Sequence, residues 1–232
     1  MDLKWKDAFV TLGPSLLQGV VVVLQATFFG FILATIIGLL VAICRLSKLK
    51  PLRAIFVVLV EIIRGTPLLV QLFYIYYVIP ILLDGLLKAL GSGSANIQFS
   101  ALSAGIAGLA INYGAYISEV FRSAILTIDT GQKESGLALG FTEQQVLRKI
   151  IIPQALRNSI PVLGNYLVMM IKDTSLLAVI SVSELLLRTQ TYASQTFETV
   201  ESYTMLAVVY LILSLPLSHL MKMIENKFHI VR

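Results

Sequence analysis

The feature that most constrains the fold is a run of 37 uncharged residues near the N-terminus, from Ala8 to Cys44. A helix needs about 20 mainly apolar residues to cross the roughly 30 Å hydrocarbon core of a bilayer. The run therefore predicts a membrane-spanning helix with residues to spare. Because proline interrupts helices, we expect a break near Gly13-Pro14, an interfacial stretch before it, and a first span over about 17–42.

Four more stretches of low charge predict four further spans. Their approximate bounds are 52–79, 100–121, 160–186 and 202–221. After Arg64 in the second stretch, residues 65–83 are uncharged and long enough to cross a membrane alone. We expect an all-α integral membrane protein of about five transmembrane helices, with a single domain over residues 1–232.

The composition excludes soluble and disordered proteins. Hydrophobic residues make up 57% of the chain, charged residues only 13%, and the mean hydropathy is +0.85, whereas soluble domains carry about 25% charged residues. Disorder requires few apolar residues. The only cysteine, Cys44, allows no internal disulfide, and the two histidines belong to no cluster that could bind a metal.

The distribution of lysine and arginine predicts the orientation, because these residues are retained on the cytoplasmic side of short loops. Most of them lie in segments 44–53, 122–158 and 222–232, after the first, third and fifth spans. The segments after the second and fourth spans hold only Lys88 and Arg188. We expect the N-terminus outside and the C-terminus in the cytoplasm.

Small residues recur at helical spacing in the first and third spans, where they let helix backbones approach closely. They are Gly30, Ala34, Gly38 and Ala42 in the first span, and Ala101, Ala104, Gly105, Gly108, Ala110, Gly114 and Ser118 in the third. Such stripes are typical of packing within one bundle or of a seam between two subunits, and both interpretations stay open.

Charged side chains inside spans are costly and raise functional questions. Glu61 and Arg64 have the spacing of a local ion pair near the start of their helix, and Glu119 and Arg122 repeat it. The pair Lys172-Asp173 lies more than two turns from either end of the expected fourth span. A role in a substrate path and a structural pair between helices are both compatible with that position.

The polar segment 123–158 predicts two short helices on the cytoplasmic side. Asp129 and Gln132 have capping-box spacing, followed by a helix over about 131–139 that Gly140 ends in a left-handed conformation. Thr142 and Gln145 form a second capping box, and the second helix should end before Pro153. Such a hairpin is typical of a partner-docking element or of a helix at the lipid interface.

At this loop the chain resembles the membrane-spanning permease subunits of ATP-binding-cassette importers, and within them the polar amino acid uptake family. The signature of that family is Glu-Ala-Ala, three residues, Gly, nine residues, Ile, one residue, Leu-Pro. The sequence keeps this spacing with Glu134-Ser135-Gly136, Gly140, Ile150 and Ile152-Pro153. It departs from the pattern at Ser135, Gly136 and Ile152, and glycine in place of alanine costs a helix about 1 kcal/mol.

The resemblance covers most of residues 15–225. Its further blocks are residues 64–73, residues 114–116 with Glu119 and Arg122, residues 131–132, residues 153–157 and residues 172–176. The resemblance implies that the hairpin couples the permease to an ATPase. The coupling residues would be Glu134, Ser135, Gly136, Gly140, Ile150 and Pro153.

The family resemblance also implies partners and a location, a prokaryotic inner or plasma membrane. These partners are a second permease, identical or related, two cytoplasmic ATPase subunits and an extracytoplasmic binding protein that delivers the amino acid. The chain contains no Gly-x4-Gly-Lys-Ser/Thr loop for nucleotide phosphates. We therefore expect ATP and Mg on the ATPase subunits, no cofactor on this chain, and no nucleic-acid partner.

An amino acid carries both an ammonium and a carboxylate, so its path needs hydrogen-bond acceptors and donors. Lys172 and Asp173 with Thr174 and Ser175 supply both kinds. Further candidates for the substrate path are Asn165, Arg64, Thr66 and Gln71.

Two rival functions fit parts of the sequence. An ATP-independent secondary transporter or channel would explain five spans and a charged pair, but not the ordered hairpin. An intramembrane enzyme is not supported, because the sequence lacks His-Glu-x-x-His and Gly-x-Ser-x-Gly motifs. The expected outer segment 181–201, with Glu184, Arg188, Glu198 and Glu201, is interpreted either as a contact for the binding protein or as a solvated acidic loop.

Overall fold

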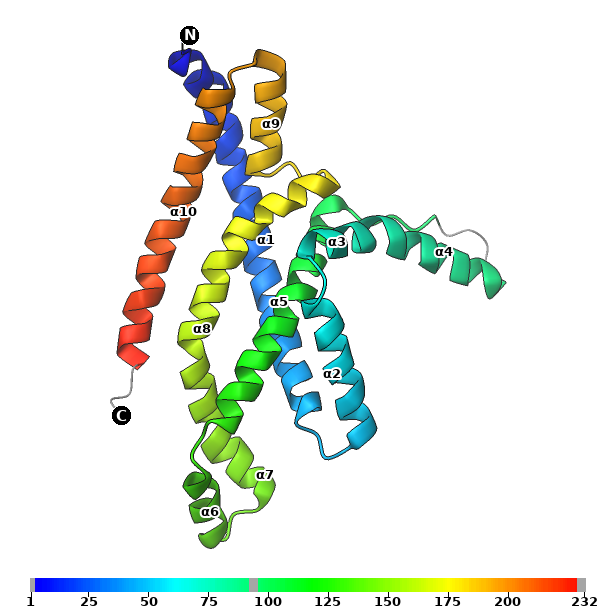
Figure 1. The fold of residues 1–232 in the computed structure, drawn as a ribbon, viewed down its shortest axis with the longest axis vertical. Coiled ribbons are helices and arrows are strands. Elements are labelled where there is room, and N and C mark those ends of the chain that lie inside the picture. The colour runs from blue at the N-terminus through cyan, green and yellow to red at the C-terminus, as the bar shows by residue number, and fades with distance from the viewer. Residues whose placement is uncertain (1–2, 92–95, 229–232) are drawn as a thin grey trace.

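The computed structural model describes residues 3–91 and 96–228, and every regular element in this part of the chain is helical (Figure 1). The expected cytoplasmic tail beyond residue 228 lies outside it. In chain order the elements are α1 (Trp5–Arg45), α2 (Lys50–Arg64), α3 (Leu68–Phe73), a π-helical segment (Tyr74–Val78), α4 (Ile79–Ala89), α5 (Ala101–Leu126), α6 (Thr130–Ala138), α7 (Glu143–Val146), a second π-helical segment (Leu147–Ile151), α8 (Ile152–Asp173), a 3-10 segment (Thr174–Ile180), α9 (Leu185–Thr196) and α10 (Thr199–Phe228). The all-α class is confirmed.

Four described segments are long and apolar enough to cross a membrane, judged by length and composition. They are Trp5–Arg45, Leu68–Ala89, Glu143–Ile180 and Thr199–Asn226. The 26-residue helix α5 is not among them, and polar residues such as Asn112 and Tyr113 lie in its middle. Because α5 packs against α1, α2, α3 and α8, these polar side chains face protein. The side of the membrane on which each terminus lies stays a prediction.

Helix α1 is continuous, so the expected break at Gly13-Pro14 is wrong, while the interfacial position of the residues before it stays a prediction. One face of α1 is buried on both sides of Pro14, at Ala8 and Leu12 before it and at Leu16 after it, in a cluster shared with α9 and α10. These contacts support the helix on both sides of the proline, which membrane helices tolerate when neighbours support them. At 41 residues, α1 is about 60 Å long, twice the hydrocarbon thickness.

The expected second span over 52–79 is wrong as a single helix. Helix α2 ends at Arg64, residues 65–67 are not helical, and the chain resumes as α3 at Leu68. Pro67 disfavours the helical conformation of the residue before it and has no N–H to donate. Figure 1 shows α2 running beside α1 and α5, while α4 extends away from the bundle.

The fourth span also differs from its expected bounds of 160–186. Helix α8 ends at Asp173, a 3-10 segment follows, and Ser181 turns the chain in a left-handed conformation with φ +64°. Lys172-Asp173 therefore lie at the end of α8, not in mid-helix. The expected third and fifth spans are confirmed as helices, although α5 extends to Leu126 and α10 is longer at both ends.

The small-residue stripes pack α1 against α5 within the chain. Gly38 lies so close to α5 that an added Cβ would meet Ile117 Cγ2 at 2.6 Å, and a Cβ on Gly114 would meet Ile37 Cγ2 at 2.8 Å. Gly105 and Gly108 of α5 likewise face leucines of the 3-10 segment and of α3. The interpretation of the stripes as packing within one bundle is confirmed.

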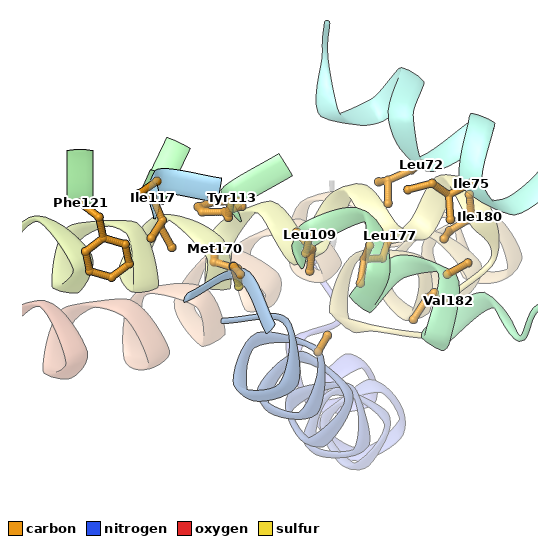
Figure 2. Close-up of a cluster of buried hydrophobic side chains, with 14 residues drawn as sticks. Leu72, Ile75, Leu109, Tyr113, Ile117, Phe121, Met170, Leu177, Ile180 and Val182 are labelled. Carbon is orange, nitrogen blue, oxygen red and sulfur yellow. The ribbon is translucent and has the colours of Figure 1, made fainter. Parts of the chain in front are cut away.

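The main apolar core surrounds α5. Figure 2 shows Leu109, Tyr113, Ile117 and Phe121 of α5 with residues of α3, α8 and the 3-10 segment. Leu72, Leu109, Ile117 and Leu177 are fully buried. The break after α2 and the end of α8 are therefore both anchored on α5.

At the opposite end from α6 and α7, the carboxylates of segment 181–201 hold helices together. Glu184 is fully buried and accepts the backbone N–H groups of Leu186 and Leu187, each at 2.8 Å, and the hydroxyl of Tyr210 on α10 at 3.1 Å. Glu201 is buried as well and accepts the N–H of Lys4 at 2.7 Å. The interpretation of this segment as a solvated acidic loop is therefore wrong for both residues.

The close approach of α1 and α5 predicts a penalty for any side chain at Gly38. We expect Gly38→Ala to lower the free energy of unfolding by about 1–3 kcal/mol, because Ile117 is β-branched and cannot easily move aside. Thermal unfolding of the purified protein in mild detergent measures the change.

Gly13→Ala is the matched control in the same helix, because nothing lies within 4 Å of a Cβ added there. Its melting temperature should be unchanged or higher, since alanine favours helix. Equal losses in the two variants would contradict the packing role of Gly38.

Candidate functional site

A cavity of about 680 Å³ lies where the break after α2 faces α5 and α8. Its walls are mostly aromatic and polar, with one cationic and one anionic side chain. The lining residues are Arg64, Gly65, Thr66, Pro67, Leu68, Asn112, Tyr113, Tyr116, Val162, Asn165, Tyr166, Met169 and Asp173. A cavity of this size with a few polar groups is large enough for a small organic ligand.

The anionic group of the cavity is Asp173 at the end of α8. The hydroxyl of Tyr113 donates to Asp173 Oδ2 at 2.7 Å, across from α5 to α8. One acceptor bond leaves most of the lone pairs of the carboxylate available. Asp173 is therefore positioned by Tyr113 and can still accept hydrogen bonds from a ligand.

Three tyrosines line the same cavity. The ring of Tyr166 on α8 lies edge-on to Tyr113, with centroids 6.0 Å apart, and 6.2 Å from the ring of Tyr116. The Cζ atom of Arg64 lies 5.2 Å from the centroid of Tyr116, within the range of a cation–π contact. The expected ion pair between Glu61 and Arg64 is therefore wrong, because Arg64 turns to α5 instead.

Gln71 of α3 holds the break after α2 together. Its Nε2 atom donates to the carbonyl of Ile63 at 2.7 Å and to Thr66 Oγ1 at 2.8 Å, and its Oε1 atom accepts from Asn112 Nδ2 at 3.1 Å. One side chain thus satisfies groups left open by the break and ties them to α5. Gln71 stands behind the cavity wall and does not line it.

The cavity brings together four of the eight residues expected on the substrate path: Arg64, Thr66, Asn165 and Asp173. Lys172 is exposed and does not line it. The hydroxyls of Thr174 and Ser175 donate to backbone carbonyls one turn back, at 2.6 and 2.8 Å, so they end the helix. The adjacent charges at 172 and 173 are thus separated, with only the carboxylate in the cavity.

Sequence reasoning missed Tyr113, Tyr166, Asn112 and Met169. Aromatic residues in an apolar helix are usually core residues, and Tyr113 is indeed buried. A usable signal was present, because Asn112, Tyr113 and Tyr116 place polar groups on one side of an otherwise small-residue helix.

A second cavity of about 380 Å³ adjoins the first on the side of α6 and α7. The two share Arg64, Tyr116, Val162 and Tyr166 in their linings, and the second adds Glu119, Ser123 and Asn158 among others. Beside it, Glu119 pairs with Arg122, as expected from the spacing, and also with Arg45 Nη1 of α1 at 2.6 Å. This ion-pair network joins the ends of α1 and α5.

The helical hairpin is formed by α6, α7 and the π-helical segment after α7. The expected end of α6 is confirmed: Gly140 has φ +84°, and the N–H groups of Gly140 and Phe141 reach the carbonyls of Leu137 and Gly136 in a Schellman motif. The capping box of Thr142 and Gln145 is confirmed too. Asp129 caps α6 through Gly131, at 2.6 Å, and does not form the expected box with Gln132.

Gly136 allows the two arms of the hairpin to touch. The residue is buried, and an added Cβ would meet Val146 Cγ2 at 2.8 Å and Ile150 Cδ1 at 2.9 Å. Glycine in place of the family's alanine at position 136 therefore allows a close contact between the two arms. The helix propensity that glycine loses relative to alanine is offset here by this packing.

The second arm does not end before Pro153, contrary to the expectation. Helix α7 continues through the π-helical segment Leu147–Ile151 into α8. A π-turn is wider than an α-turn, which makes room for the proline ring and already interrupts the regular hydrogen-bond ladder.

The outer surface of the hairpin combines charge with exposed apolar side chains. Glu134 and Ser135 are exposed, and Leu139, beside Gly140, is 77% exposed. Lys48, in the turn between α1 and α2, forms an ion pair with Glu143 at 2.7 Å, which raises the pKa of the Lys48 ammonium. The hairpin is thus linked to the start of α2.

Residues 14–230 match the family model described as "Binding-protein-dependent transport system inner membrane component". Among curated relatives, the glutamine transport system permease protein GlnP of Escherichia coli (strain K12) is 34% identical over 231 residues, which is 100% of both chains. The L-cystine transport system permease protein TcyB of Bacillus subtilis (strain 168) is 35% identical and covers 97% of this chain and 91% of the relative.

A solved structure described as "an amino acid ABC transporter with histidines" has a similar fold. Its chain superposes with a TM-score of 0.84 at 32% identity, covering 98% of this chain and 99% of that one. Chains of a methionine ABC transporter share the fold at 18% identity, with a TM-score of 0.63.

The contact at Gly136 predicts that a larger side chain there opens the hairpin. Gly136→Leu should destabilise the packing of α6 on α7 by about 1–3 kcal/mol, because Val146 is β-branched and stiff. Hydrogen–deuterium exchange over residues 130–151 measures the loss of protection. Ser135→Leu, which adds the same side chain at the exposed neighbouring position, should leave the exchange unchanged; similar deprotection in both variants would contradict this contact.

Proposed function

The chain belongs to the family of binding-protein-dependent transport system inner membrane components and is the permease subunit of an amino acid ABC importer, and from that premise we propose how it works. The protein is an inner-membrane component. ATP would be hydrolysed by two separate cytoplasmic ATPase subunits. A second permease, identical or related, would complete the membrane part, and an extracytoplasmic binding protein would deliver the amino acid.

The observation that carries the proposed substrate path is the cavity between the break after α2, α5 and α8. It holds one carboxylate, Asp173, and one guanidinium, Arg64, together with neutral hydrogen-bond donors and acceptors. A zwitterionic amino acid presents the complementary pair of charges. Asp173 would accept from the ammonium, while Arg64 and Asn165 would donate to the carboxylate.

The tyrosine rings suit the same ligand. An ammonium is attracted to the face of an aromatic ring, so Tyr113, Tyr116 and Tyr166 would support its passage along the wall without holding it tightly. In a path, a site must bind well enough to fill and weakly enough to empty.

The hairpin is the proposed contact for the ATPase. It lies at the opposite end of the bundle from α9 (Figure 1), and its exposed leucines with Glu134 would fit a groove on a partner. ATPase closure would then shift the equilibrium between inward and outward access of the cavity. Such a shift requires the ATPase to bind the two conformations with different affinity.

The coupling role predicts that the hairpin can be disabled without loss of the bundle. We expect Glu134→Ala/Gly140→Ala to abolish amino acid uptake, because the change removes the exposed carboxylate and strains the left-handed residue at φ +84°. Uptake by the complete importer is measured alongside membrane insertion, which should survive. Ser135→Ala restores the family residue at an exposed site and should transport normally; normal uptake by the double variant would refute the coupling role.

The path predicts a difference between two adjacent charged residues. Asp173→Asn should raise the KM for uptake at least about tenfold, since about 1.4 kcal/mol of interaction with an ammonium is worth that factor. Lys172→Gln is the matched control, because Lys172 does not line the cavity. Unchanged uptake in Asp173→Asn, in a well-expressed importer, would remove this cavity from the path.

A further inference from the structure

The two cavities meet at a single set of side chains. Arg64 and Tyr116, with Tyr166 and Val162, line both the larger cavity and the smaller one. Asn165 and Asp173 line only the larger cavity, whereas Ser123 and Asn158 line only the smaller. The shared residues therefore lie where the two cavities adjoin, one cavity near the break and the other on the hairpin side.

The contact at this junction is held by one weak interaction. The guanidinium of Arg64 lies 5.2 Å from the ring centre of Tyr116, and among the described residues it has no hydrogen bond or ion pair. Glu61, one turn earlier on α2, is exposed and does not pair with it. The guanidinium thus covers the aromatic face while its donors stay free.

Arg64 also ends a lightly packed helix. Of the fifteen residues of α2 only Val60 is buried, and the helix ends at Arg64, directly before the break at Gly65. The far end of α2 follows the turn whose Lys48 is paired with Glu143 of the hairpin. The position of Arg64 is therefore governed by a lightly packed helix between a break and the hairpin.

We propose that Arg64 and Tyr116 form a gate between the two cavities, closed when the guanidinium covers the ring and opened when α2 moves it away. The guanidinium occupies the ring face that the ammonium of an amino acid would otherwise reach, so the chain's own cation blocks the route to the hairpin side. The role of the gate in transport rests on the proposed function. The existence of a barrier between the two cavities does not.

Cysteine accessibility in the complete importer, without nucleotide, tests the barrier. Cys44, the only cysteine of the chain, is replaced by serine, and either Asn165→Cys or Ser123→Cys reports on one cavity. Membrane vesicles are exposed, on the side that carries the hairpin, to the anionic reagent sulfonatoethyl methanethiosulfonate. An anionic reagent is chosen because loss of the Arg64 charge would slow its arrival, so any acceleration reports an opened path.

With Arg64 in place, Asn165→Cys should react at least about tenfold more slowly than Ser123→Cys. Arg64→Gln should raise the rate at Asn165→Cys severalfold and leave Ser123→Cys unchanged. Arg64→Lys keeps a cation for the ring and should stay slow. Tyr116→Leu should open the path and Tyr116→Phe should not, which gives an independent pair if an Arg64 variant assembles poorly.

Two results would overturn the gate. One is equal labelling of Asn165→Cys and Ser123→Cys with Arg64 present, which would mean that no barrier exists. The other is slow labelling of Asn165→Cys in both Arg64→Gln and Tyr116→Leu, which would place the barrier elsewhere. Neither labelling result requires substrate, so the gate and the substrate path are tested separately. If labelling supports the gate while Asp173→Asn transports normally, the substrate path is refuted and the gate is not.

Discussion

The close packing of α1 on α5 is the constraint on which the rest of the structure depends. Glycines at positions 38 and 114 bring the two backbones together, with isoleucines of the opposite helix filling the space that side chains would take. In a membrane, where apolar side chains gain nothing by leaving lipid for protein, such contact is a main source of helix association. It fixes α5 in the centre, and α2, α3 and α8 then pack around α5.

The cavity follows from what α5 carries on its other faces. Leu72 of α3 and Leu177 of the 3-10 segment pack on glycines of α5, so the break after α2 and the end of α8 are drawn to the same helix. Between them, Tyr113 and Tyr116 face Tyr166 of α8. The polar groups that a membrane would otherwise penalise are satisfied by one another, as with Tyr113 and Asp173.

Features that depend on neighbouring residues were predicted correctly from the sequence. Features that depend on contacts between distant helices were not. The left-handed end at Gly140 and the capping box at Thr142 depend on a few neighbouring residues, and both were predicted. The continuity of α1 through Pro14 depends on packing against α9 and α10, and the turn of Arg64 from Glu61 to Tyr116 depends on α5. To predict that only Asp173 of the pair 172–173 faces the cavity, the end of α8 had to be known. Apolar content alone placed that end at residue 186, too far along the chain. Tyr113 and Tyr166 of the cavity were missed because aromatic residues in apolar helices resemble ordinary core residues.

The π-helical segment after α7 has a mechanical consequence. From Glu143 to Asp173 the chain is helical without a loop, through α7, the π-helical segment and α8. This continuous segment carries the second arm of the hairpin at one end and Asn165, Tyr166 and Asp173 further along it. A displacement of α7 therefore reaches these three side chains through helix alone, and the wider π-turn is the irregular point along the way.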